Sequence, residues 1–152
     1  GRGAVSFDYD NDGDLDLFVV NQRPVYDMTY KGGVVKSKLY KNNSIDNNNW
    51  LKVKLKGKLA TTRGLGARVT LFLPELQMIR EVDGGSSHAS QNSSIIHFGL
   101  GQNQIVDSVT VTWPGGKTQS LVNPGINQLI EIEEFYSKET SIFQIIMNYF
   151  RN

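Results

Sequence analysis

Residues 50–56 read WLKVKLK, and this strict alternation of apolar and basic residues decides the fold class of the chain. On an extended backbone, Leu51, Val53 and Leu55 lie on one side and the lysines on the other. A period of two is typical of a β-strand with one buried face. The lysines form either a solvated strand face or a stripe that binds an anionic ligand, and the pattern favours the solvated face.

Similar segments recur toward the C-terminus, separated by turns that contain glycine, asparagine or proline. The expected strands cover residues 68–73, 78–82, 95–98, 109–113, 117–122 and 128–133. In the last of these, Leu129 is expected to be buried, together with Ile130 or Ile132. No helical segment of about 10–15 residues separates the strands, which argues against a parallel α/β sheet. The pattern therefore predicts an all-β chain with an antiparallel β-sandwich.

Residues 8–16 read DYDNDGDLD and carry a second, chemical signal. The five aspartates Asp8, Asp10, Asp12, Asp14 and Asp16 would repel one another in a compact loop unless a cation neutralised them. Ca²⁺ accepts about six to eight oxygen ligands, which alternate residues of a tight turn can supply. Gly13 permits the sharp backbone turn that such a loop needs.

This stretch is not an EF-hand, because that loop ends in a bidentate glutamate at its twelfth position, where this chain has Val19. We expect side-chain ligands from Asp8, Asp10, Asp12 and Asp16, and the backbone carbonyl of Asp14. A cage of carboxylates favours Ca²⁺ over the smaller Mg²⁺. The alternative is a solvated acidic turn without metal.

Composition narrows the function classes. The chain has 152 residues, a net charge of +1 and no cysteine. The near-neutral charge gives no reason to expect a nucleic-acid partner, and the lack of cysteine excludes disulfides and thiolate chemistry. No apolar run approaches the roughly 20 residues of a membrane-spanning helix. Extracellular calcium modules work at concentrations that the cytosol lacks, so an extracellular, periplasmic or cell-surface location is expected.

A few other residues can be interpreted in two ways. Trp50 and Trp113 either pack in the core or stack on sugars, and only Trp50 is kept as a candidate glycan-binding residue. His97 is more consistent with a structural role than with metal ligation. His88 follows a serine, but adjacent residues do not form a catalytic triad, so no enzymatic activity is expected. Residues 136–152 carry apolar side chains at helical spacing and predict a short C-terminal helix.

Two parts of the chain resemble known families. Residues 7–17, read as FDYDNDGDLDL, and the later Leu39-Tyr40-Lys41-Asn42 resemble one FG-GAP or VCBS-type calcium repeat. Such repeats form blades of β-propellers. The region from Trp50 to Glu133 resembles the ASPIC/UnbV domain, through the motifs GLGARV at 64–69, HFGLG at 97–101 and the segment that runs from Val109 into Pro114-Gly115-Gly116.

The resemblance implies three regions: a partial β-propeller-type calcium repeat at 1–45, an ASPIC/UnbV-like β-sandwich at 46–135, and a tail at 136–152. It also implies a secreted or surface protein of which this chain is a piece. The expected function is a non-enzymatic calcium-binding module for adhesion or matrix interaction, with a protein or glycan surface as partner. The alternatives are a carbohydrate-binding module and an accessory domain of a larger secreted enzyme.

Overall fold

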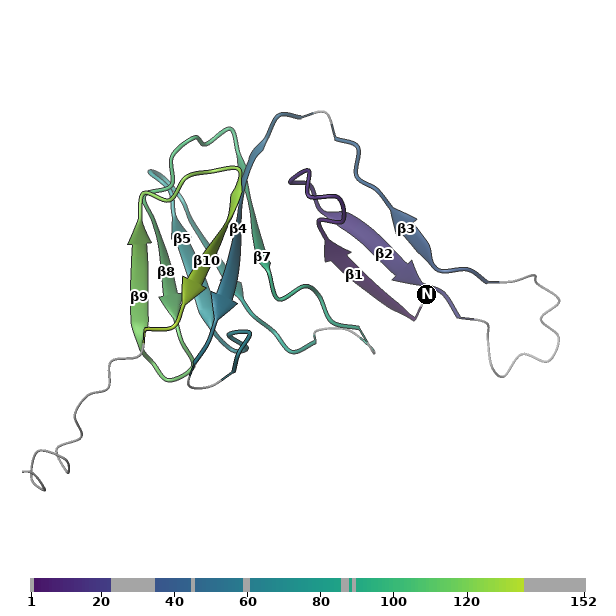
Figure 1. The fold of residues 1–152 in the computed structure, drawn as a ribbon. Helices are drawn as coiled ribbons and strands as arrows, with labels where there is room; N and C mark the ends of the chain where they lie inside the picture. The colour runs from purple at the N-terminus through teal and green to yellow at the C-terminus, as the bar shows by residue number, and fades with distance from the viewer. Residues whose placement is uncertain are drawn as a thin grey trace, which may run out of the picture.

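A computed structural model of the chain describes residues 2–22, 35–44, 46–58, 61–85, 88 and 90–135. Within these ranges the regular structure consists of ten strands in three sheets. Figure 1 shows a small N-terminal sheet beside a larger two-sheet unit. The expectation of an all-β chain is thereby confirmed, whereas the helix expected at 136–152 lies outside the described residues.

The N-terminal sheet contains β1 (Gly3–Phe7), β2 (Asp16–Val20) and β3 (Lys38–Tyr40), in that order and antiparallel. Phe7 pairs with Asp16, so the aspartate-rich stretch is the loop that joins two paired strands. This loop lies on the side of the sheet that faces the larger unit (Figure 1).

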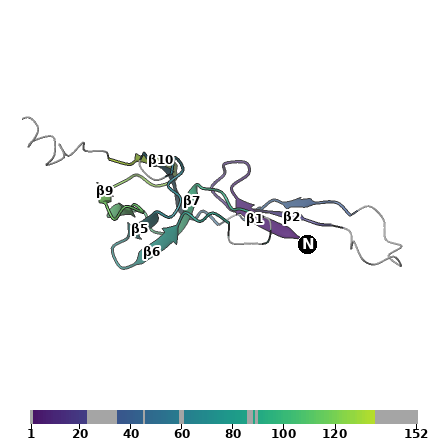
Figure 2. The same cartoon turned by 90° about the horizontal axis from the view of Figure 1, so that it is seen from below.

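The larger unit is a β-sandwich. One sheet has the order β10-β4-β7 and the other has the order β6-β5-β8-β9. Figure 2 shows these two layers from below, beside the N-terminal sheet. The strands are β4 (Asn49–Lys56), β5 (Arg68–Phe72), β6 (Gln77–Glu81), β7 (Ile96–Gly101), β8 (Ser108–Thr112), β9 (Thr118–Val122) and β10 (Gln128–Glu133). Each segment expected to be a strand from residue 50 onward is therefore one.

The core lies between the two layers of the sandwich. It contains the alternating apolar residues of β4, β5, β7 and β8, which the sequence pattern placed inward. Fully buried members include Leu51, Val53, Val69, Leu71, Phe98, Val109 and Val111. Trp113 is also buried, at 2% exposure, which confirms it as a core residue. Its indole N–H donates to Gln119 Oε1 at 2.8 Å, which satisfies the buried polar group.

Two expectations about β10 were wrong in detail. The sandwich is not wholly antiparallel, because β10 pairs with β4 in parallel. The chain crosses from β9 in one sheet to β10 in the other, and this crossing makes β10 run in the direction of β4. Leu129 is 47% exposed, whereas Ile132 is 8% exposed. The register that pairs Ile132 with Leu55 places the isoleucine on the core side and Leu129 on the outside.

Candidate metal centre

Backbone geometry closes the aspartate loop tightly between β1 and β2. Asn11 and Gly13 both have positive φ, of 62° and 99°. Asparagine and glycine are the residues that adopt such angles at least cost, so the sequence is locally matched to this loop. The loop consequently folds back on itself, and its alternate side chains can converge.

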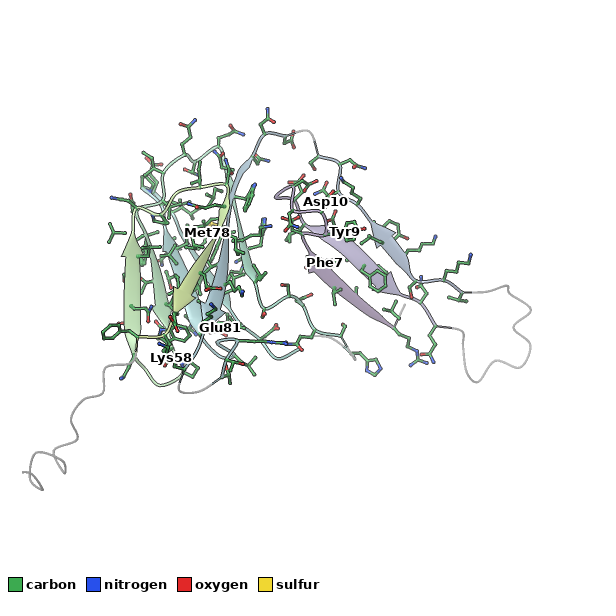
Figure 3. The ribbon with its side chains drawn as sticks, viewed as in Figure 1. Phe7, Tyr9, Asp10, Lys58, Met78 and Glu81 are labelled. Carbon is green, nitrogen blue, oxygen red and sulfur yellow. The ribbon has the colours of Figure 1, made fainter. Side chains whose placement is uncertain are left out.

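Three carboxylates meet in this loop. One oxygen from each of Asp8, Asp10 and Asp16 lies within 4.8 Å of the others, which is a spacing that one metal ion could bridge. Figure 3 labels Asp10 beside Tyr9 in this loop. The structure does not bring Asp12 and Asp14 into this group. Asp12 Oδ1 instead accepts a hydrogen bond from the backbone N–H of Asp14 at 3.0 Å.

Asp16 organises the loop through both of its carboxylate oxygens. It is 1% exposed. Oδ2 accepts from the backbone N–H of Tyr9 at 2.7 Å, and Oδ1 accepts from that of Asn42 at 2.8 Å. Asp16 therefore joins the start of the loop to the segment after β3. Each carboxylate oxygen has two lone pairs, so these bonds leave room for a metal ion.

Asp8 has one occupied oxygen and one free oxygen. Oδ2 accepts from the backbone N–H of Gly13 at 3.1 Å and from Lys52 Nζ at 2.6 Å. Oδ1 is buried and has no hydrogen-bond partner among the described residues. A buried carboxylate oxygen without a partner is costly, so an ion or a water molecule is expected to satisfy it.

Lys52 corrects the interpretation of the lysine face of β4 as solvated. Its side chain is only 9% exposed, because the aspartate loop covers this part of the strand. Lys54 and Lys56 do lie in solvent, where both pair with Glu131. The alternation in sequence could not distinguish the three lysines, because the covering loop lies about forty residues away along the chain.

On the outer side of the loop, Lys41 forms an ion pair with Asp10. This hydrogen bond and the charge of Lys41 lower the pKa of the Asp10 carboxyl, and Asp10 in turn raises the pKa of Lys41. Asp12 Oδ2 lies 3.7 Å from the same ammonium. Lys41 thus neutralises part of the charge of the loop and keeps Asp10 ionised over a wider pH range.

Gly13 of the loop packs directly on the sandwich. Its carbonyl oxygen lies 2.7 Å from His97 Nε2, and because a carbonyl only accepts, the ring nitrogen is the donor. Trp50 covers the Cα of Gly13 so closely that an added Cβ would lie 2.0 Å from the indole Nε1. The Trp50 and His97 rings stack with centroids 6.4 Å apart. These contacts agree with a structural role for His97, while the glycan-binding role of Trp50 stays a prediction.

A cleft of about 680 Å³ lies between the N-terminal sheet and the sandwich. Its lining includes Asp8, Asn11, Lys52 and His97, so it reaches the inner side of the aspartate loop. The cleft therefore borders Asp8, whose side chain is 4% exposed.

The residues present fit a hard divalent cation. Three convergent carboxylates, one of which has a buried oxygen without a partner among the described residues, are oxygen donors of the kind that Ca²⁺ binds. The sequence predicted this location and two further ligands, Asp12 and Asp14. It gave no signal for the sandwich residues that hold the loop, because no spacing rule links them to it.

Comparison with curated proteins finds relatives that match nearly the whole chain. Cartilage acidic protein 1 of Homo sapiens and that of Mus musculus are each 31% identical over 135 residues, which cover 87% of this chain and 19% of theirs. Cartilage acidic protein 1 of Xenopus tropicalis is 31% identical over 147 residues, or 92% of this chain and 21% of its own. The chain thus spans about a fifth of the length of these relatives.

The described residues contain no helix of the length and apolarity that crossing a membrane requires. The model of the family described as "ASPIC and UnbV" matches residues 57–139, which begin just after β4 and include every later strand. This match covers more than half of the 152 residues. The chain belongs to the ASPIC and UnbV family.

Proposed function

We propose that the loop of residues 8–16 binds Ca²⁺ and that the ion acts structurally, in a non-enzymatic extracellular module for adhesion or matrix interaction. The observation that carries the calcium site is the convergence of the Asp8, Asp10 and Asp16 carboxylates, together with a buried Asp8 Oδ1 that has no hydrogen-bond partner among the described residues. A bound cation would satisfy that oxygen and offset the repulsion among the three carboxylates.

The charge balance supports a further cation. The loop holds five aspartates, and among the described residues the two lysines that pair with it, Lys41 and Lys52, neutralise only part of that charge. An ion with two positive charges would remove most of the remainder. Ca²⁺ suits the loop better than Mg²⁺, because carboxylates and a backbone carbonyl can surround the larger ion without demanding ideal octahedral geometry.

The wider role rests on the similarity to proteins named cartilage acidic protein 1. It also rests on the resemblance of the N-terminal sequence to an FG-GAP or VCBS repeat. This part of the chain forms the three-stranded sheet β1-β2-β3. The proposal includes a location outside the cytosol, because extracellular calcium modules have a Kd of roughly 10⁻⁴–10⁻³ M and fill only at the calcium concentrations found there. A calcium-loaded loop would fix the angle at which β1 and β2 enter the sheet.

Thermal unfolding with and without calcium tests the site. An ion that binds only the folded protein stabilises it by RT ln(1 + [L]/Kd), or about 1–2.3 kcal/mol at about 5 mM Ca²⁺ for these affinities. For a chain of this size the Tm should then rise by roughly 2–9 °C relative to EDTA. The same concentration of Mg²⁺ should raise it less.

Asp10→Asn is the variant of choice, because it removes one ligand charge at an exposed position without disturbing the buried bonds of Asp8 and Asp16. It should lose most of the rise in Tm. Asp46→Asn, at an exposed aspartate outside the cluster, should respond as wild type does. A wild-type Tm that is the same in calcium and EDTA would refute the site.

A further inference from the structure

The acidic loop is held against the sandwich by a buried ion pair. Lys52 Nζ lies 2.6 Å from Asp8 Oδ2 and 3.4 Å from Asn11 Oδ1. The Lys52 and Asp8 side chains are 9% and 4% exposed. Burying two such charges is costly, and a pair is retained in this way only where its geometry and hydrogen bonds offset the loss of water.

Trp50 extends this contact on both sides. Its ring lies under the Lys52 ammonium, 4.8 Å from the centroid, and it stacks on His97. His97 in turn holds the carbonyl of Gly13. Lys52, Trp50 and His97 come from the neighbouring strands β4 and β7, which pair Lys52 directly with His97. These three residues are called the docking triad below.

The same aspartate serves both the loop and the sandwich. Asp8 Oδ2 accepts from Lys52 and Gly13, and the Asp8 carboxylate is also one of the three that converge in the loop. The orientation of this carboxylate toward an ion is therefore fixed by a residue of the other unit.

We infer that the docking triad is the second half of the calcium centre: it positions Asp8 and Gly13, so that ion binding and docking of the N-terminal sheet onto the sandwich are coupled. The inference rests on the proposed calcium site. Because coupling between two equilibria is reciprocal, the ion strengthens docking and docking strengthens ion binding by the same factor. In the metal-free protein, Lys52 supplies the charge that keeps the loop in place.

His97→Ala tests the positioning role without touching a ligand or a charge pair. It removes the hydrogen bond to Gly13 and the stacking partner of Trp50. The calcium Kd, measured by isothermal titration calorimetry, should rise by about 3–10-fold, the loss expected for one hydrogen bond and its packing. His88→Ala, at an exposed histidine, is the matched control and should leave the Kd unchanged. An unchanged Kd in His97→Ala would overturn the coupling.

Lys52→Met tests the charge and gives a second readout. In EDTA the variant should lose roughly 6–20 °C in Tm, because Asp8 is left without a counter-ion. In saturating calcium the loss should be larger still, because weaker docking raises the calcium Kd and the variant gains less stability from the ion. Lys54→Met is the matched control, because Lys54 is exposed and lies two residues further along the same face of β4. Its Tm should fall little in either buffer.

These outcomes separate the inference from the calcium site itself. A wild type that responds to calcium, with equal losses of Tm for Lys52→Met in EDTA and in calcium, would keep the site and overturn the coupling. A wild type without any calcium response would refute the site, and with it the coupling, even if Lys52→Met still lowered the Tm in EDTA.

Discussion

Gly13→Ala is the sharpest probe of the contact between the aspartate loop and the sandwich, because it leaves every charged group in place. Gly13 has a φ of 99°, and the Trp50 indole occupies the position that a side chain at residue 13 would take. The substitution therefore has two costs, one in the backbone and one in the contact with Trp50.

The backbone cost is that of an alanine at positive φ, about 1–2 kcal/mol. The contact cost follows from the added Cβ, which would lie 2.0 Å from Trp50 Nε1. Ordinary contact needs about 3.5 Å, so the loop would have to move away by roughly 1.5 Å. That movement would break the hydrogen bond between His97 and the Gly13 carbonyl, which contributes about 0.5–1.5 kcal/mol. The sum is about 1.5–3.5 kcal/mol, or roughly 3–14 °C in Tm.

Gly116→Ala is the matched control, since Gly116 has a φ of 81° and no atom of another described residue lies within 4 Å of an added Cβ. It carries the backbone cost alone. The assay compares the Tm of both variants with that of wild type by circular dichroism, in EDTA and in calcium. Trp50→Ala combined with Gly13→Ala should restore part of the excess loss, because the indole is then absent. If Gly13→Ala loses no more than Gly116→Ala, the packing of the loop against Trp50 is refuted.

Two further predictions concern single carboxylates. Asp16→Ala should destabilise the protein by about 1–3 kcal/mol even in EDTA, because it leaves the backbone N–H groups of Tyr9 and Asn42 unpaired. Urea unfolding measures this loss of stability. A loss seen only in calcium would contradict the prediction. On the sandwich, hydrogen bonds from Lys56 and Lys54 lower the pKa of Glu131. The ionised Glu131 therefore stabilises the folded protein at pH values above its unfolded pKa, and this stabilisation is lost as the pH falls through its folded pKa. Lys56→Met should raise the Glu131 pKa toward its ordinary value in an NMR titration, whereas an unchanged titration would refute the pairing.

The local patterns determined most of the fold. The strands of the sandwich follow from alternation, because the side-chain period of a strand is fixed by backbone geometry and one buried face selects apolar residues at every second position. The aspartate loop is equally local, since five acidic residues around Gly13 have few other compact arrangements. Both features can be predicted from short stretches of sequence, because residues that are close in sequence are also close in space there.

The tertiary structure decided the features that depend on residues far apart in the sequence. The parallel pairing of β10 with β4, and with it the exposure of Leu129, depends on a crossing between sheets. By sequence alone Lys52, Lys54 and Lys56 are equivalent, yet only Lys52 is covered by the aspartate loop. The sequence by itself thus specified the strands and the acidic loop. Which lysine, tryptophan and histidine hold that loop depends on contacts between residues 37 to 84 positions apart, and these form only when the two units pack together.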